Sequence, residues 1–124
     1  MIVDGKYDSI IGSSDPSFLG DKTKYNTEEL FLSSISSCHM LWYLHLCSIH
    51  NIIVLEYIDC AIGVMKEFEN GSGKFVEVTL NPKIIISHSI NINKANLLHE
   101  EANKMCFIAN SCNLPIKHNQ TIRS

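Results

Sequence analysis

The sequence lacks a long hydrophobic run, a secretory signal and a basic stripe, and each absence excludes a class of protein. The longest apolar stretch, residues 40–49, is interrupted by His45 and is much shorter than the ~20 residues that span a bilayer. Residues 1–8 include Asp4 and Asp8 and contain no apolar core, which argues against a secretory signal. Acidic and basic residues alternate along the chain, and the net charge is -3. We therefore expect a cytoplasmic protein that binds neither a membrane nor nucleic acid.

The chain is short and moderately hydrophobic, which favours one compact domain over residues 1–124. Apolar residue types make up 45% of its 124 residues, enough for a core and too many for a disordered chain. A domain of this length buries a modest share of its surface, so association into a homodimer is a reasonable expectation.

The cysteines do not have the number or spacing of a disulfide scaffold. There are 5, an odd number, with no CxxC pair and no export signal. Cys47 follows Cys38 by nine residues, on the opposite face of one predicted helix and about 13 Å further along, so these two cannot pair. Cys60 is interpreted as a packing residue of a strand, and Cys112 as a bystander.

Motifs of other catalytic classes are missing too. Residues 99–103 read HEEAN and lack the second histidine of HExxH, and no group of Cys and His has zinc spacing. There is no GxSxG, and the GSG at 71–73 falls in a turn without a following helix, unlike a phosphate loop. We expect neither a metal nor a bound cofactor. His39 diverges from Cys38 by about 100° on a helix, which favours a packing or dimer-contact role over electrostatic assistance to the thiol.

Periodicity and turn residues predict an α+β domain with helices packed on antiparallel strands. Asn26 before two acidic residues is typical of a helix start. This helix reaches about residue 50 with apolar residues on nearly every face, which predicts a buried helix, either the central helix of the fold or part of a dimer core. Asn93 is expected to cap a second helix over 94–110 with one broad buried face. The ENGSG at 69–73 indicates a hairpin, and Pro82 a bulge or sheet edge. Strands are expected at 2–3, 9–11, 52–65, 75–87 and 114–117.

Cys38 and Cys106 are the cysteines that the two predicted helices contribute. Cys38 follows four serines within 33–37, and small residues let another element approach a helix closely. Helices packed at the usual distance could place the two thiols within disulfide reach. The spacing alone is equally compatible with two ordinary core cysteines.

Two stretches of the sequence carry a family resemblance. NTEELF at 26–31 followed by SSCHML at 36–41 resembles the Asn-Pro-Glu-(Glu/Gln)-Leu … Ser-(Ser/Ala)-Cys signature of the OsmC/Ohr family, the osmotically inducible protein C and organic hydroperoxide resistance proteins. CFIANS at 106–111 is similar to the stretch around the second family cysteine, in a C-terminal helix. The resemblance extends over residues 4–118, and the paired motifs at this spacing are more specific than either alone.

This resemblance implies an OsmC-like fold, with two long helices against curved sheets in an intertwined homodimer. It implies a thiol-dependent peroxidase, with Cys38 as the peroxidatic cysteine, Cys106 as the resolving one and Glu28 at the place of the family glutamate. Organic hydroperoxides would be the substrates, and an external dithiol, often of the lipoyl type in relatives, would be the reductant. Apolar neighbours of the second cysteine would favour alkyl or fatty-acid peroxides over hydrogen peroxide.

The sequence also departs from the family pattern. The family site uses an N-terminal arginine, whereas the only arginine here is Arg123, so we expect that the first family strand is missing and that Lys22 or Lys24 is the candidate substitute. Glu28 and Cys38 would lie about 15 Å apart along a straight helix, which predicts either a site shared by two subunits or a break in the helix. Two alternatives therefore stay open: a catalytically weak relative that binds hydrophobic small molecules, and a structural dimeric domain with inert cysteines.

Overall fold

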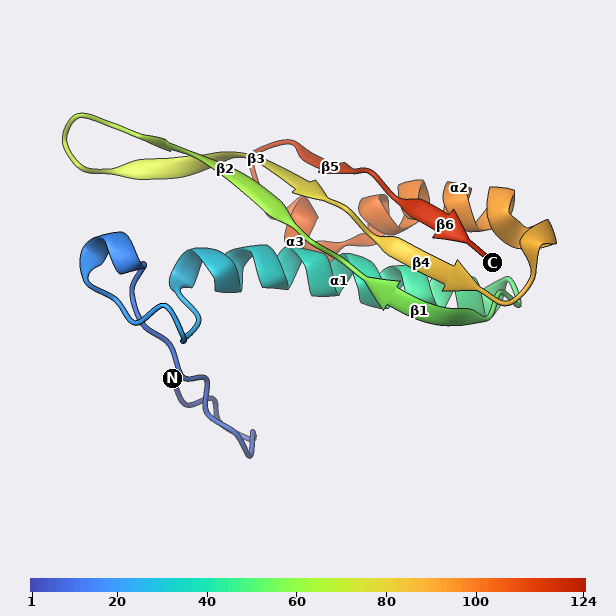
Figure 1. Ribbon diagram of the computed structural model, residues 1–124, viewed down its shortest axis with the longest axis horizontal. Coiled ribbons are helices and arrows are strands. Elements are labelled where there is room, and N and C mark those ends of the chain that lie inside the picture. Colours follow the sequence, from blue (N-terminus) through green and yellow to red (C-terminus); the bar gives the residue numbers. More distant parts are fainter.

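The computed structural model describes residues 1–124 and places two helices side by side beneath strands of two small sheets (Figure 1). The long helix α1 spans Thr27–Ile49, and α2 spans Ile92–Met105 with the short α3, Phe107–Asn110, after it. None of the helices combines the length and the apolar character needed to cross a membrane. The strands are β1 (Val54–Ile58), β2 (Ile62–Glu67), β3 (Gly73–Leu80), β4 (Lys83–Ile86), β5 (Ile116–His118) and β6 (Thr121–Arg123).

The start of α1 is the capping box that its sequence predicts. Asn26 adopts an extended backbone, and its side-chain oxygen accepts a hydrogen bond of 2.8 Å from the Glu29 N–H. The Glu29 carboxylate accepts in return from the Asn26 N–H at 3.2 Å. These reciprocal bonds satisfy two of the donors that a helix N-terminus leaves unpaired, so the beginning of α1 is locally encoded.

Replacing Asn26 by alanine is expected to lower the free energy of unfolding by about 1 kcal/mol, because the side-chain acceptor for the Glu29 N–H is lost. Urea denaturation measures this change. The control is Asn26→Asp, which keeps an acceptor oxygen and should retain most of the stability. Equal losses in both variants would show that the cap is not the source of the effect.

Only one side of α1 is buried within the chain, so α1 is not a fully buried central helix, and its place in a dimer core stays a prediction. The buried positions recur every three or four residues, as expected for one helix face: they are Ile35, His39, Tyr43, Leu46 and Cys47. By contrast, Leu41 and Ile49 are 63% and 58% exposed. Apolar residues therefore also occupy faces of α1 that the rest of the chain leaves exposed.

Each predicted β segment between the helices is split into two strands that lie in different sheets. One sheet has the order β1-β4-β6 and the other the order β2-β3-β5. The expected strands at 52–65 and 75–87 are therefore each interrupted, whereas the hairpin at 69–73 joins β2 to β3 as predicted. Pro82 lies between β3 and β4, where its missing N–H cannot donate to a strand ladder.

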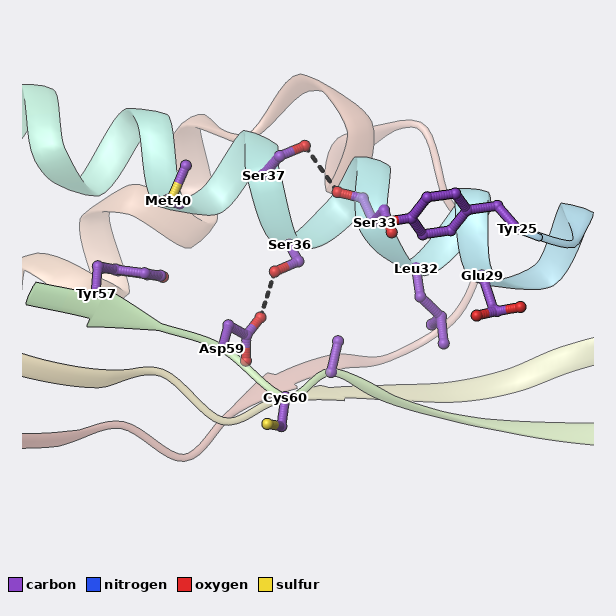
Figure 2. Close-up of a pocket in the computed structure, with 11 residues that line it drawn as sticks. Tyr25, Glu29, Leu32, Ser33, Ser36, Ser37, Met40, Tyr57, Asp59 and Cys60 are labelled. Carbon is purple, nitrogen blue, oxygen red and sulfur yellow. Dashed lines mark hydrogen bonds between the residues drawn. The ribbon is translucent and has the colours of Figure 1, made fainter. Parts of the chain in front are cut away.

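The interruptions are held by a polar cluster around Asp59. One carboxylate oxygen of Asp59 accepts from the Asn81 N–H at 2.7 Å, and the other accepts from the hydroxyl of Ser36 on α1 (Figure 2). The Asn81 side chain in turn donates to the Cys60 carbonyl at 2.9 Å. These side-chain bonds take the place of strand pairing at the interruptions. The long β segments therefore bend here and are connected to α1 through Ser36.

The predicted final strand at 114–117 is found as β5, and β6 follows it. Both run parallel to their partners, β3 and β4, while β1–β4 and β2–β3 are antiparallel. The predicted α+β class is thus confirmed, but the sheets are mixed instead of purely antiparallel. The cause is the α2–α3 connection, which returns the chain beside β3 in the same direction.

The second predicted helix ends early. Cys106 has an extended backbone (φ -68°, ψ 110°), which separates α2 from α3. Asn93 is not the cap, since α2 begins at Ile92 after a 3-10 turn, Ser89–Asn91. The expected broad buried face is also smaller than predicted, because the apolar side chains near the break are largely outside: Leu97, Met105, Phe107 and Ile108.

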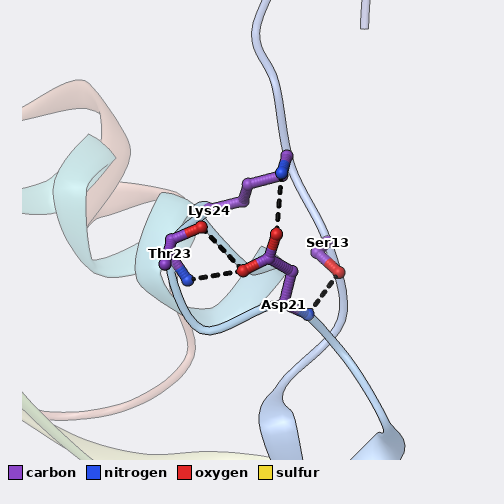
Figure 3. Close-up of polar contacts among 4 residues, drawn as sticks. All are labelled: Ser13, Asp21, Thr23 and Lys24. Carbon is purple, nitrogen blue, oxygen red and sulfur yellow. Dashed lines mark hydrogen bonds and ion pairs between the residues drawn. The ribbon is translucent and has the colours of Figure 1, made fainter.

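The segment before α1 forms no strands, which corrects the expectation for residues 2–3 and 9–11. It extends away from the sheets, with only an isolated bridge between Gly12 and Tyr25 (Figure 1). Without a neighbouring strand, its backbone groups have no ladder to join. Near α1 the loop is organised by Asp21, whose carboxylate accepts from Thr23 and Lys24 while its N–H donates to Ser13 (Figure 3).

Candidate active site

Cys38 lies midway along α1, on the side of the helix that faces α3. Its side chain is half-buried. Trp42 follows one turn later on the same side, and its ring meets that of Phe107 edge-on at a centroid distance of 6.0 Å. Cys38 thus stands beside apolar side chains and remains open to solvent in part.

Cys106 occupies the break between α2 and α3 and is fully buried, at 0% exposed. Its sulfur accepts a hydrogen bond of 3.3 Å from the Ala109 N–H. Burial, followed by a hydrogen bond with the side chain of Cys38, raises the pKa of the Cys106 thiol to about 11. The fold therefore brings together two free cysteines that are 68 residues apart in the chain.

The two thiols of this pair differ in their access to solvent. A molecule from solvent can reach the half-buried Cys38, whereas Cys106 lies behind it with no exposed surface. The raised pKa keeps Cys106 protonated at neutral pH. The geometry thus distinguishes an outer thiol from an inner one.

Glu28 is not close to these thiols within one chain. It lies in the first turn of α1, where its carboxylate accepts from the Thr27 hydroxyl at 3.0 Å. The helix is continuous from Thr27 to Ile49, so the alternative of a helix break between Glu28 and Cys38 is wrong. Ten residues of straight helix separate the two by about 15 Å. A role for Glu28 beside Cys38 therefore stays a prediction about two subunits.

The basic residues that could replace the family arginine either pair with an acid, lie in the β1–β4–β6 sheet, or are exposed in the loop before α1. Lys24 donates to Asp21 at 2.7 Å, and this bond is the largest cause that lowers the pKa of the Asp21 carboxyl (Figure 3). Arg123 lies in β6, where it lines a small cavity of the β1–β4–β6 sheet together with Glu56 and Lys83. Lys22 is exposed in the loop and makes no ion pair.

Replacing Lys24 by methionine is expected to leave the rate of Cys38 alkylation unchanged, because Lys24 contacts Asp21 and not the thiols. Stopped-flow reaction with iodoacetamide at pH 7 measures that rate. Lys22→Met serves as the matched comparison from the same loop. A marked slowing in Lys24→Met alone would mean that this ammonium group leaves Asp21 and acts on Cys38.

A cluster of histidines lies next to the thiols, and the sequence interpretation missed it. His39 of α1 and His99 of α2 are both buried, and His39 Nε2 lies 3.0 Å from His99 Nδ1. His118 of β5 stacks on His39 at 5.7 Å, and Tyr43 stacks on His99 at 3.8 Å. Helical spacing could have suggested this cluster in the sequence. His39 and Tyr43 are four residues apart on one helix, and His99 precedes Cys106 by seven residues. The burial of His39 favours packing over dimer contact as its role, and its partner His99 was not predicted.

The chain matches the family model described as OsmC-like protein over residues 20–120. This match includes Cys38 and Cys106, the helices α1 to α3 and the strands β1 to β5, and it ends just before β6. The chain belongs to the OsmC family. No curated protein sequence shows a significant match to it.

Solved structures of OsmC-family proteins share this fold. An OsmC-like protein of unknown function from Vibrio cholerae is 27% identical, with a TM-score of 0.81 over 90% of this chain and 77% of that one. An organic hydroperoxide resistance protein OsmC from Legionella pneumophila is 17% identical, with a TM-score of 0.67 and coverages of 90% and 79%. OhrB of Bacillus subtilis, an organic hydroperoxide resistance protein, is 21% identical, with a TM-score of 0.64 and coverages of 81% and 73%.

The other cysteines of this OsmC-family chain lie away from the thiol pair. Cys47 is buried beneath Tyr43, and burial raises the pKa of its thiol. Cys112 donates to the Ile108 carbonyl at 3.2 Å. Cys60 is exposed and lines a groove of about 440 Å³ between α1 and residues 57–61, which does not include Cys38 (Figure 2). No group of three or more Cys, His, Asp or Glu side chains is arranged to hold a metal ion.

Proposed function

We propose that this OsmC-family protein is a thiol peroxidase that reduces organic hydroperoxides through Cys38 and Cys106. The observation that carries the proposal is the pairing of a half-buried thiol with a fully buried one across the α1–α2 interface. Family membership and the names of the Legionella and Bacillus structures support it. An outer thiol suits attack on a substrate, and an inner one suits closure of a disulfide.

The proposed reaction has two steps at the protein. The Cys38 thiolate attacks the terminal peroxide oxygen, the O–O bond breaks, and the alkoxide takes a proton and leaves as an alcohol. Cys38 is then a sulfenic acid. The Cys106 sulfur attacks it, hydroxide leaves with the Cys106 proton as water, and a Cys38–Cys106 disulfide remains. An external dithiol, which we expect to be of the lipoyl type, then reduces the disulfide by exchange.

The surroundings of Cys38 favour an apolar peroxide. Leu41 and Trp42 follow Cys38 at helical spacing and line a cavity of about 300 Å³ with His45. Phe107 is 70% exposed beside Trp42. Binding an alkyl group would remove these side chains from water, a gain that hydrogen peroxide cannot provide.

The complete site is proposed to form in a homodimer in the cytoplasm. The exposed apolar residues of α1, Leu41 and Ile49 among them, would gain cover from a second subunit. In such an assembly Glu28 of one subunit would approach Cys38 of the other, because the straight α1 keeps them apart within one chain.

Steady-state turnover tests the proposal. With dihydrolipoamide as reductant, the protein should consume cumene hydroperoxide with a kcat/KM at least tenfold above that for hydrogen peroxide. Equal rates for both peroxides would contradict the apolar substrate class. No consumption above the uncatalysed rate would contradict the enzyme itself.

The position of the only arginine favours a second candidate, a weakly active relative that binds hydrophobic small molecules. Arg123 lines a cavity of the β1–β4–β6 sheet, so no guanidinium stands among the residues around Cys38. Fluorescence of Trp42, the single tryptophan, would report binding of a fatty acid in its cavity. Saturable quenching without peroxide turnover would favour this candidate over the peroxidase.

A further inference from the structure

We propose that His39 and His99 are a positioning pair that holds α1 and α2 at the register where the Cys38 and Cys106 thiols meet. The inference rests on the proposed function, because it concerns the same two thiols. It assigns a role to buried polar side chains that the proposed chemistry does not use.

The pair forms a directional contact between the two helices. His39 Nε2 and His99 Nδ1 are 3.0 Å apart, with ring planes only 9° from parallel. Tyr43 stacks on the other face of His99, and its hydroxyl donates to the Ala95 carbonyl at 3.0 Å. Two polar contacts thus join α1 to α2, one turn apart, within an otherwise apolar interface.

Both histidines are rigidly connected to the thiols. His39 directly follows Cys38 on α1. His99 precedes Cys106 by seven residues, and Cys106 directly follows Met105, the last residue of α2. Because helices move as stiff units, a slide of α2 along α1 that breaks the imidazole contact moves the thiols apart by a similar distance.

Apolar packing alone would specify this register weakly. The neighbouring contacts are made by small or branched side chains such as Ala95, Leu98 and Ala102, and such surfaces tolerate small shifts. A buried hydrogen bond does not, since its loss leaves unpaired polar atoms. Buried polar pairs are known to fix helix register elsewhere at a cost in stability.

The buried interface favours the state in which both rings are neutral. One shared hydrogen joins the rings, and their other nitrogens, His39 Nδ1 and His99 Nε2, have no partner. A further proton would therefore create a buried charge with an unpaired donor. Burial and the neighbouring histidines already lower the pKa of His39 to about 4 and that of His99 to about 3.

The groups that face the pair do not offset an added positive charge. Tyr43 on α1 and the more distant Tyr57 on β1 are phenols whose raised pKa keeps them neutral, as burial does for Cys47. His118 on β5 stacks on both rings, and its Nε2 lies 3.5 Å from the Glu100 carboxylate of α2 at the surface. The one acid nearby is therefore beside His118, not beside the pair. Acid should weaken the pair and, with it, the approach of the thiols.

The test measures the equilibrium between the dithiol and the Cys38–Cys106 disulfide in glutathione buffers at pH 7, by mass spectrometry after alkylation. His99→Leu should lower the disulfide equilibrium constant about tenfold, which corresponds to the loss of one buried hydrogen bond. His99→Asn, which keeps a polar atom near the place of Nδ1, should recover part of it. His50→Leu, an exposed position directly after α1, is the control and should match the wild type.

A second experiment measures the same equilibrium constant as a function of pH, on proteins that remain folded. The glutathione thiol stays protonated from pH 7 to 4, so a fall in the wild-type equilibrium constant reports on the protein. With pKa values of about 4 and about 3 for the two imidazoles, the fall is expected only as the pH approaches 4. In the double variant His39→Leu/His99→Leu the fall should disappear. Circular dichroism at each pH restricts the comparison to samples that remain folded.

The outcomes separate the two proposals. A wild-type disulfide whose equilibrium constant is unchanged in folded His99→Leu and independent of pH would overturn the positioning role and leave the peroxidase intact. Absence of any Cys38–Cys106 disulfide in the wild type would overturn the two-cysteine mechanism, and the positioning role with it. Peroxide turnover is not needed for either result.

Discussion

Replacing Cys38 by serine is expected to lower peroxide turnover by roughly a thousandfold or more, to the uncatalysed background. A serine hydroxyl has neither the nucleophilicity of a thiolate toward peroxide oxygen nor a redox chemistry that could store the oxygen atom. Loss of cumene hydroperoxide, followed with a ferrous xylenol orange assay, measures the effect. Serine is close in size to cysteine, so circular dichroism should show an unchanged fold.

The other cysteines provide the matched comparison. Cys106→Ser should still react once with peroxide, because the outer thiol remains, and should then stall as a sulfenic acid that dimedone traps. Cys60→Ser, at an exposed position in a separate groove, should turn over like the wild type. Comparable activity in Cys38→Ser and Cys60→Ser would contradict the assignment of Cys38 as the peroxidatic residue.

The protein is expected to lose stability steeply between pH 6.5 and 4 because of His39 and His99. Burial lowers the pKa of these side chains from 6.5 to about 4 and about 3. Above pH 6.5 both are neutral whether the chain is folded or not, so they add no pH dependence. Below it the unfolded chain binds protons that the folded chain excludes, and the loss continues until the pH passes through the folded pKa values. Each histidine then costs about 1.4 kcal/mol per pH unit.

Urea midpoints measured at half-unit steps of pH test this slope. Two excluded protons correspond to about 3 kcal/mol per pH unit, which would exhaust a typical domain stability of about 5–15 kcal/mol within a few units. The variant His39→Leu/His99→Leu should show a much flatter profile, and His45→Leu, exposed on α1, should keep the wild-type slope. A wild-type stability that stays constant from pH 6.5 to 4.5 would contradict the neutral burial of the pair.

The elements that could be predicted from the sequence are those with local signals. Asn26 and Glu29 encode the start of α1 through bonds made within four residues. The glycines around residues 71–73 encode the β2–β3 turn, where Gly71 adopts a φ of 88°. The family resemblance was also carried by short motifs, and the match over residues 20–120 confirmed it.

The features that were missed depend on contacts between distant segments. The split of the strands is held by Asp59, whose partners are Ser36 and Asn81, more than twenty residues away in each direction. No proline or glycine in the sequence marks the end of α2 at Cys106. The position of Cys106 depends on its contact with Cys38 of α1. Parallel pairing of β5 and β6 follows from the return of the chain after α3.

The candidate site shows the same division. Cys38 and Cys106 could be selected from the sequence because family motifs marked both, whereas helical spacing alone did not separate them from ordinary core cysteines. The pairing of His39 with His99 could not, because it needs the relative register of α1 and α2, which no local pattern contains. Glu28 remains a prediction about a second subunit, since a continuous α1 keeps it from Cys38 within the chain.

The most direct test of the two-cysteine account is the intact mass of the reduced protein after one equivalent of cumene hydroperoxide, with thiol counting and peptide mapping. The account predicts rapid loss of two thiols, a mass lower by two hydrogens, and a single cross-linked peptide pair that joins Cys38 to Cys106. Five unchanged thiols, or a disulfide that involves any other cysteine, would contradict it.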